Sequence, residues 1–200
     1  MQPLILASGS AVRATLLRNA GLTFEARDSR VDEEAVKKRF ARGDEEGAID
    51  ALAVTLAEEK ALAVSRAEPA ALVIGADQIL SCGPRRFDKP RDMDEARENL
   101  LFFRGRAHTL HSGLALASGG RTVWTFSDRA HLTMRSFTDE FLAAYLAALG
   151  DKVRTSVGCY QLEGPGIQLF ERIEGDYFTI LGLPLLPLLA ELRRLGEAQS

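Results

Sequence analysis

The sequence predicts a mixed α/β protein that folds as one globular unit. Segments with the apolar patterns typical of strands alternate along the chain with segments whose apolar residues recur at helical spacing. The chain has 200 residues, of which 46% are hydrophobic and 26% are charged. This length and composition allow a substantial buried core and do not indicate disorder.

The N-terminal part is expected to begin as a strand, a turn and a helix. The apolar run LILA precedes small polar residues, and apolar positions at helical spacing then continue as far as Gly21. Three acidic residues stand ahead of a lysine-rich stretch, an order of charges that suits the macrodipole of a helix. The predicted elements are strands over residues 4–7 and 23–26, and helices over 11–20, within RVDEEAVKKRF, and over 49–67.

The rest of the chain continues this alternation. A buried strand is predicted over residues 71–74, with Asp77 and Gln78 at or near its end. The loop SCGPRRFDKP leads to a helix over 93–103, for which Asp92 is the expected N-cap. The remaining predictions are strands over 108–117 and 122–134 joined as a hairpin through SGGR, a helix over 138–149, a strand within LEGPGIQLFERIEG, and a helix over 184–195.

Charge and cysteine usage limit the classes of partner. The formal net charge is -3, without a basic stripe that could follow a nucleic-acid backbone, so a small anionic ligand held by a few cations is favoured over nucleic acid. Cys82 and Cys159 lack metal-binding spacing and indicate reduced thiols in a reducing cytoplasm. No apolar run approaches the roughly 20 residues that cross a bilayer. We therefore expect a cytoplasmic protein without a membrane partner.

The stretch LILASGSAVRATLLRNAG has the features of an anion-binding turn. Backbone N–H groups at the N-terminus of a helix, together with the hydroxyls of Ser8 and Ser10, can face one phosphate, while Arg13 adds a fixed fork of donors. The alternative is that these residues only turn the chain and cap the helix. The glycine patterns of P-loops and dinucleotide-binding turns are absent.

Carboxylates and cations elsewhere supply what hydrolysis of a nucleoside triphosphate requires. Asp77 directly follows a predicted buried strand, so it must be paired, solvated or bound to a cation, unless it only forms an Asx turn. Glu33 alone is explained by a helix start, Lys60 by a solvated helix face and Lys89 by a loop. Together with Arg13, these four residues provide carboxylates that can hold a divalent cation and orient water, and cations that can bind the phosphates.

The histidines and the second cysteine are expected to be structural. His108, His111 and His131 lie in predicted strands at spacings that do not form a zinc set, so we interpret them as packing or hairpin residues. Cys159 has no recognisable histidine or asparagine partner and is predicted to be a buried thiol.

Eight short segments follow the motif order of a known family. LASGSAVRATLL is similar to LAS-x-S-P-R-R-x-x-LL, and RVDE, EEKAL, GADQIL and FDKP are similar to the segments that follow it. RGRAHTLHSGLAL is similar to G-R-x-H-x-V-x-T-G, and the C-terminal signature is matched by VGCYQLEGPGIQLFERIEG and ILGLPL. The chain resembles the Maf family of nucleotide pyrophosphatases nearly from end to end.

The resemblance implies a single domain over residues 1–200 and a hydrolytic reaction, NTP plus water giving NMP and pyrophosphate. The implied fold has an elongated mixed sheet with flanking helices and two lobes around a cleft, similar to inosine triphosphate pyrophosphatases, and a homodimer is possible. Mg²⁺ or Mn²⁺ is the implied cofactor, because both ions suit oxygen ligands and phosphate. The implied catalytic residues are Asp77, Glu33, Lys60 and Lys89, with Glu33 and Asp77 at the metal, and the implied substrate-binding residues are Ser8, Ser10, Arg13, Gln78, Gln161 and Glu163.

Asp77 matches the family's proton acceptor. Beside two lysines and a metal ion, its pKa is expected to be lowered, so that its carboxylate holds metal and water.

Departures from the motifs bear on the substrate. The branch directed to dTTP and UTP has Pro-Arg-Arg where this chain has Ala-Val-Arg, and Val12, Gln78 and Glu163 are more similar to the 7-methyl-GTP branch. Tyr160 and Gln161 are more similar to the dTTP/UTP pattern. We expect 7-methyl-GTP or another modified nucleotide, with dTTP/UTP hydrolysis and a nucleotide-binding regulator of cell division as the alternatives.

Overall fold

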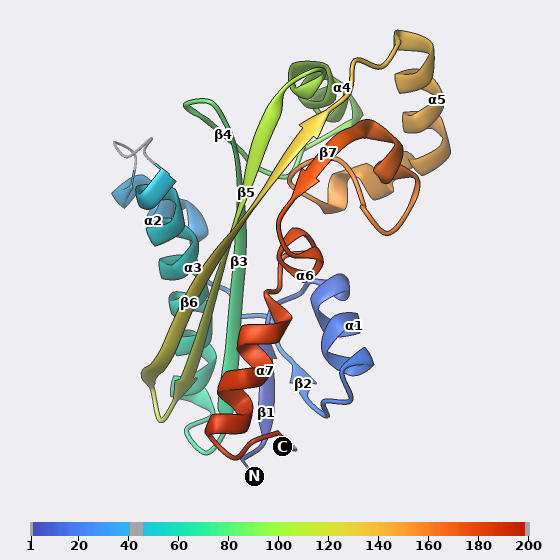
Figure 1. Ribbon diagram of the computed structural model, residues 1–200. Helices are drawn as coiled ribbons and strands as arrows, with labels where there is room; N and C mark the ends of the chain where they lie inside the picture. The colour runs from blue at the N-terminus through green and yellow to red at the C-terminus, as the bar shows by residue number, and fades with distance from the viewer. Residues whose placement is uncertain (1, 41–45, 199–200) are drawn as a thin grey trace. The chain divides into compact units, whose positions relative to one another are not determined.

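The computed structural model describes residues 2–40 and 46–198. Over these residues, seven strands form one mixed sheet in the order β2-β1-β3-β5-β6-β7, with β4 paired to β3 (Figure 1). Strand β1 is parallel to β2 and to β3, whereas the pairs β3 with β4 and β6 with β7 are antiparallel. The predicted mixed α/β fold is confirmed.

The chain divides into two compact units. The first contains Met1–Gln78, His111–Asp128 and Asp176–Ser200, and the second contains Ile79–Leu110 and Arg129–Gly175. The strands β3 (Leu72–Cys82), β5 (Ala107–Ser118) and β6 (Arg121–Met134) each contribute residues to both units. The predicted division into two lobes corresponds to these units.

The first unit contains the predicted N-terminal strand, turn and helix. Its further elements are β1 (Leu4–Ala7), α1 (Ala11–Asn19), β2 (Glu25–Ala26), α2 (Glu33–Arg39), α3 (Glu46–Ala67), α6 (Tyr177–Ile180) and α7 (Leu185–Arg194). Side-chain caps begin three of the helices, because Ser10, Asp32 and Asp176 accept hydrogen bonds from backbone N–H groups in the first turns of α1, α2 and α6.

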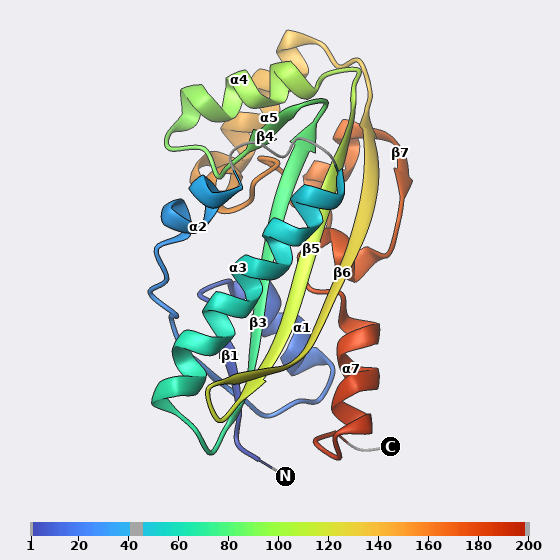
Figure 2. The same cartoon turned by 90° about the vertical axis from the view of Figure 1, so that its left-hand side faces the viewer.

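Helices cover both faces of the sheet in this unit, with α3 on one face and α1 and α7 on the other (Figures 1 and 2). Because side chains alternate along a strand, each strand supplies both faces. The face with α1 and α7 is rich in leucine, including Leu6, Leu17 and Leu188. The face with α3 consists mainly of alanine and valine. Helix α3 therefore packs against small side chains.

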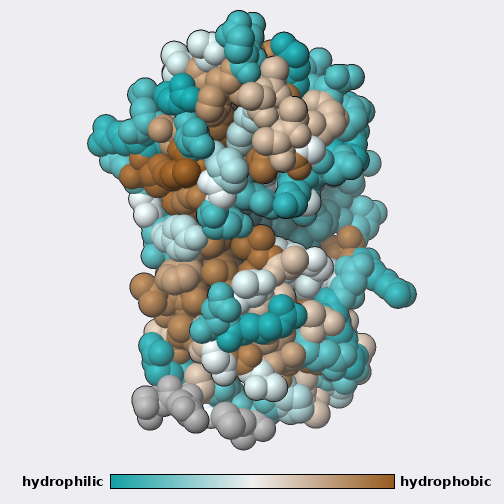
Figure 3. All heavy atoms as spheres, turned by 90° about the vertical axis from the view of Figure 1, so that its right-hand side faces the viewer, coloured by the Kyte–Doolittle hydropathy of each residue, from teal (hydrophilic) through white to brown (hydrophobic). Residues whose placement is uncertain are grey.

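Apolar side chains of this unit also reach the surface, and polar and apolar atoms are mixed where α1, α6 and α7 lie (Figure 3). Val123, Tyr177 and Leu186 are the large exposed ones among the described residues of the unit. None of the described helices combines the length and the apolarity that a membrane span needs.

The second unit has an aromatic core. Its further elements are β4 (Arg85–Phe87), α4 (Met93–Phe103), α5 (Asp139–Leu149), the 3-10 turns Gly150–Thr155 and Pro165–Leu169, and β7 (Phe170–Glu174). Phe103 stacks on His108, and the rings of Tyr160 and Phe170 contact the same imidazole. Asp92 caps α4 as predicted, accepting from the backbone N–H of Glu95 at 2.8 Å.

Three details differ from the sequence-based expectations. Strand β3 continues to Cys82, eight residues beyond the predicted end at Ile74, so Asp77 and Gln78 lie inside the strand. Part of the predicted loop SCGPRRFDKP is strand β4, because Arg85–Phe87 pairs with the end of β3 and satisfies its backbone groups. The short helix α6 was not predicted.

Candidate active site

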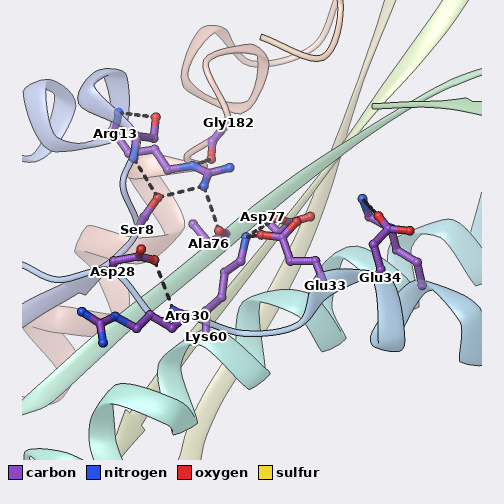
Figure 4. Close-up of polar contacts among 12 residues, drawn as sticks. Ser8, Arg13, Asp28, Arg30, Glu33, Glu34, Lys60, Ala76, Asp77 and Gly182 are labelled. Atoms are coloured by element: carbon purple, nitrogen blue, oxygen red, sulfur yellow. Dashed lines mark hydrogen bonds and ion pairs between the residues drawn. The ribbon is translucent and has the colours of Figure 1, made fainter. Parts of the chain in front are cut away.

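A buried lysine joins two carboxylates in the first unit. Lys60 on α3 donates from Nζ to Asp77 Oδ1 at 2.6 Å and contacts Glu33 Oε1 at 2.7 Å (Figure 4). Asp77 lies on the face of β3 that α3 covers, and Glu33 is the first residue of α2. Three consecutive elements of the chain, α2, α3 and β3, therefore meet at one ammonium group.

Two missing side chains allow α3 to approach the sheet. A Cβ at Gly75 would lie 2.0 Å from the Ala57 carbonyl oxygen and 2.9 Å from the Ala61 Cβ. A Cβ at Gly113 would lie 2.4 Å from the Ala53 carbonyl oxygen. Because Gly75 precedes Asp77 by one period of the strand, the close contact at Gly75 brings Lys60 within reach of Asp77.

Burial dominates the electrostatics of Asp77. Lys60 and Asp77 are each 8% exposed. Loss of hydration raises the pKa of Asp77, and the nearby charges of Lys60 and Arg13 offset this only in part. Without a metal ion beside the carboxylate, desolvation therefore outweighs the cations, and the lowering expected for the metal-bound site stays a prediction. A carboxylate with a raised pKa is a better proton acceptor than one held below its usual range.

The opening turn holds Arg13 in a fixed orientation. Ser10 caps α1 through the backbone N–H of Arg13, and the backbone N–H of Ser10 donates to Ser8 Oγ. The guanidinium donates from Nη1 to Ser8 Oγ at 3.1 Å and to the Ala76 carbonyl at 2.8 Å, and from Nε to the Gly182 carbonyl at 2.8 Å (Figure 4). Capping of α1 by Ser10 is confirmed, whereas anion binding by this turn stays a prediction.

Arg13 still has donors to offer. Burial lowers the pKa of its guanidinium, the charges of Asp77 and Glu33 raise it, and a guanidinium stays protonated in proteins. Its bonds to protein use Nε and Nη1, and within the described part of the chain no acceptor is assigned to Nη2. The two N–H groups of Nη2 can therefore bind an anion.

Gln78 lies beside this turn, but its amide is already engaged. Its Nε2 donates to Ser112 Oγ and to the carbonyls of Thr179 and Ile180 at 3.1, 2.9 and 3.1 Å. An amide NH₂ has two hydrogens, so this group has none left for a ligand.

Gly182 was not predicted as a site residue. Its φ of +83° favours glycine, and a Cβ there would lie 3.3 Å from Arg13 Nη2. The glycine in ILGLPL is the sequence signal that could have identified it.

The remaining predicted residues belong to the second unit. Lys89 is exposed and follows β4 by two residues. Gln161 is partly exposed, with Nε2 3.2 Å from Thr155 Oγ1, and Glu163 is exposed in the turn before Pro165. Their roles at a substrate stay predictions.

The histidines and cysteines are structural, as predicted. His108 Nε2 is hydrogen-bonded to the Tyr160 hydroxyl at 2.8 Å, His111 Nδ1 to Asp50 at 2.7 Å and His131 Nδ1 to Thr109 at 3.0 Å. Burial lowers the pKa of His108 to about 3. Cys82 and Cys159 are free and buried, and desolvation raises the pKa of Cys159 to about 12, which makes its thiol unreactive.

The donor set fits a divalent cation that binds together with phosphate. In residues 2–40 and 46–198, no group of three histidine, cysteine or acidic side chains forms a protein-only metal site. Glu33 and Asp77 instead provide two carboxylates that meet at a common cation, Lys60. Mg²⁺ is commonly bound by one or two carboxylates plus the phosphates of a substrate, so these residues suit it.

The first unit brings together a buried carboxylate, a lysine that bridges two carboxylates and an arginine at a helix N-terminus. An α/β protein with this set of side chains is suited to bind a polyanion.

The family model described as "Maf-like protein" matches residues 3–195. A 7-methyl-GTP pyrophosphatase of Rhizobium meliloti is 53% identical over the full length of both chains. A 7-methyl-GTP pyrophosphatase of Brucella suis is 52% identical over 96% of this chain and 95% of its own length. A nucleoside triphosphate pyrophosphatase of Paramagnetospirillum magneticum is 51% identical over 96% of this chain and 98% of its own. The chain belongs to the Maf family, as its motifs indicated.

Proposed function

We propose that the protein is a nucleoside triphosphate pyrophosphatase that acts on 7-methyl-GTP or another modified nucleotide. The observation that carries the proposal is the Lys60-bridged carboxylate pair in the same unit as an arginine with two uncommitted N–H donors. Relatives at about 50% identity over nearly their full lengths are named as pyrophosphatases of this kind, which supports it.

Binding of the triphosphate would begin at the N-terminus of α1. Arg13 Nη2 donates to a phosphate oxygen, while Nε and Nη1 stay bound to protein and keep the guanidinium plane fixed. Ser8 and Ser10 shape the turn and add hydroxyls near the helix N-terminus, where a negative charge is favoured. Lys89, Gln161 and Glu163 are proposed as further substrate contacts.

Asp77 would act on the attacking water. Its buried carboxylate accepts a proton from the water as the oxygen bonds to phosphorus, the α–β phosphoanhydride bond breaks, and pyrophosphate leaves with NMP as the other product. Lys60 holds Asp77 and Glu33 in position and adds positive charge near the phosphates. Each of these groups is already oriented by a protein partner, so little reorganisation is needed on binding.

Glu33 and Asp77 are the residues that would hold a divalent cation, Mg²⁺ or Mn²⁺. Such an ion neutralises phosphate charge and lowers the pKa of a bound water. Metal dependence is thus part of the proposal.

The proposed choice of nucleotide is supported by two positions and by the names of the relatives. Val12 is partly buried against the leucine-rich core and offers no charge where the dTTP/UTP branch has an arginine. Glu163 is an exposed carboxylate that can pair with the positive charge of a 7-methylguanine. These features favour 7-methyl-GTP over dTTP and UTP.

The test is hydrolysis of a panel of triphosphates by the purified protein with Mg²⁺, Mn²⁺ or EDTA. The panel contains 7-methyl-GTP, GTP, dTTP and UTP, and products are separated by anion-exchange chromatography. We expect NMP and pyrophosphate, with the highest kcat/KM for 7-methyl-GTP and loss of activity in EDTA. Release of NDP and orthophosphate would refute the reaction, and a preference for dTTP would transfer the protein to the alternative substrate class.

A further inference from the structure

Hydrogen bonds to three strands hold the segment that contains α6. Gln78 of β3 and Ser112 of β5 bind its carbonyl groups, and Asp128 of β6 binds the hydroxyl of Thr179. Two residues after Ile180, the carbonyl of Gly182 accepts from Arg13. We propose that a positioning network fixes the Gly182 carbonyl and thereby orients Arg13 toward the triphosphate. The network consists of Gln78, Ser112, Thr179 and Asp128, and this inference rests on the proposed function.

Gln78 can serve this network in only one orientation. Its Nε2 faces two backbone carbonyls, and an amide turned by 180° would place its own oxygen against both. The amide is therefore fixed as a donor to the end of α6, and Gln78 acts through this segment rather than by donating from Nε2 to the substrate.

Thr179 and Ser112 form the buried centre of the network. Both are fully buried at 0% exposure. The Thr179 carbonyl accepts from Ser112 Oγ at 2.9 Å and from Gln78 Nε2 at 2.9 Å. The Thr179 hydroxyl donates to Asp128 Oδ2 at 2.6 Å, a charge-assisted bond. Because these bonds share the Thr179 backbone and side chain, loss of one partner changes the geometry of the others.

The geometry at Gly182 passes this restraint to Arg13. The backbone N–H of Gly182 donates to the Thr179 carbonyl at 3.0 Å, so the glycine is bound directly to the centre of the network. A Cβ at Gly182 would lie 3.5 Å from both Arg13 Nε and Gln78 Oε1, so these side chains lie close to the same backbone carbon. Movement of this backbone would change the direction of the Arg13 fork and of its two uncommitted N–H groups.

The proposal is tested by asking whether network variants act through Arg13. Asp128→Asn, Ser112→Ala and Thr179→Val are each made in the wild-type background and in an Arg13→Ala background. In the wild type we expect KM for the triphosphate to rise about tenfold with kcat changed less than about threefold, because binding of the phosphate is weakened. In the Arg13→Ala background the same changes should alter kcat/KM by less than about twofold, since coupled residues are not additive. Equal losses in both backgrounds would overturn the proposal.

Two control variants separate positioning from general destabilisation. Ser65→Ala removes another fully buried hydroxyl, which accepts from the Gly120 N–H at 3.0 Å, and it should leave KM unchanged. Thr179→Ser keeps the hydroxyl and should restore the wild-type KM that Thr179→Val loses. Thermal unfolding identifies any variant that is not folded. Asp128 is partly exposed, so Asp128→Asn still tests the proposal if the changes at the buried residues unfold the chain.

A second measurement does not depend on catalysis. In ¹⁵N-labelled protein without nucleotide, the Nε–H of Arg13 is expected to exchange slowly with water, because it donates to the Gly182 carbonyl. Its resonance is assigned by its loss in Arg13→Lys. The three network variants should accelerate this exchange at least about fivefold, and Ser65→Ala should not. Unchanged exchange would refute the network, whereas faster exchange in a protein that hydrolyses no nucleotide would refute only the proposed function.

Discussion

The two units handle buried polar groups differently. In the first, Lys60 and Asp77 form a buried ion pair with Nζ and Oδ1 2.6 Å apart. In the second, His108 is 2% exposed, lies among Phe103, Tyr160 and Phe170, and has a pKa lowered to about 3, so it is neutral. Its Nδ1 has no hydrogen-bond partner in the described structure.

This difference separates candidate catalysis from packing. A buried ion pair is weak evidence for stability, since desolvation cancels much of its attraction. The proposed function accounts for its presence between α3 and β3, where the other contacts are small apolar side chains. A neutral histidine in an aromatic cluster needs no such explanation. We thus expect changes at the buried ion pair of the first unit to impair catalysis and a change at His108 of the second unit to affect only stability.

The largest effect is expected for Asp77→Asn. Removal of the proton acceptor should lower kcat about a hundredfold to ten-thousandfold, while the affinity for nucleotide remains measurable by calorimetry. Asp28→Asn, which changes an exposed aspartate of the same unit, is the matched control and should retain activity. Full turnover by Asp77→Asn would contradict the role of this carboxylate.

The second-largest effect is expected for Gly75→Ala, because the added methyl group forces α3 away from the sheet. The new methyl group would meet the Ala57 carbonyl oxygen at 2.0 Å, and overpacking of this kind costs about 1–3 kcal/mol or more. Activity should fall as well, since the contact between Lys60 and Asp77 lengthens. Denaturant unfolding and kcat/KM measure the two effects.

Gly47→Ala provides the control for this change. Gly47 is an exposed residue of the same helix with no atom within 4 Å of the added Cβ, so alanine should stabilise α3 by about 0.5–1 kcal/mol. If both variants unfolded at the same denaturant concentration, close packing at Gly75 would not be what limits the approach of α3.

A smaller effect on stability is expected for His108 at acid pH. Its folded pKa is about 3 against an ordinary value of 6.5, so from pH 6.5 down to about 3 the unfolded chain binds a proton that the folded chain does not. The free energy of unfolding should therefore fall with decreasing pH, by up to about 1.4 kcal/mol per unit from this group.

His108→Gln can still hydrogen-bond to Tyr160 but does not titrate. Between pH 7 and pH 5 it should lose about 1–2 kcal/mol less stability than the wild type, measured by urea unfolding. Parallel pH profiles for the two proteins would show that His108 does not titrate as its burial predicts.

The smallest effect on activity is expected for Lys89→Ala, because Lys89 is exposed and is proposed only as a further substrate contact. Loss of an exposed cation should raise KM for the triphosphate about tenfold and leave kcat nearly unchanged. Lys152→Ala removes another exposed lysine of this unit and should not alter KM. An unchanged KM for Lys89→Ala would show that Lys89 does not contact the substrate.

Most of the elements were predictable because their signals are local. The cap at Asp32 and the apolar periodicity around Leu17 are written in neighbouring residues, and both were confirmed. The position of Asp77 inside β3 was not predictable, because the strand continues past the apolar run through pairing with other strands of the sheet. The raised pKa of Asp77 also escaped prediction, since it depends on burial beneath α3.

The sequence by itself determined the family, the order of the strands and helices along the chain, and the residue types that could hold a triphosphate. These follow from short-range patterns and from motif order, which need no spatial information. Only the tertiary structure decided that one ammonium group joins Glu33 and Asp77, that Gln78 binds the end of α6, and that Gly182 fixes Arg13. Each of these contacts joins residues that are far apart in the chain, and the distance between such residues is set by how closely helices and strands pack.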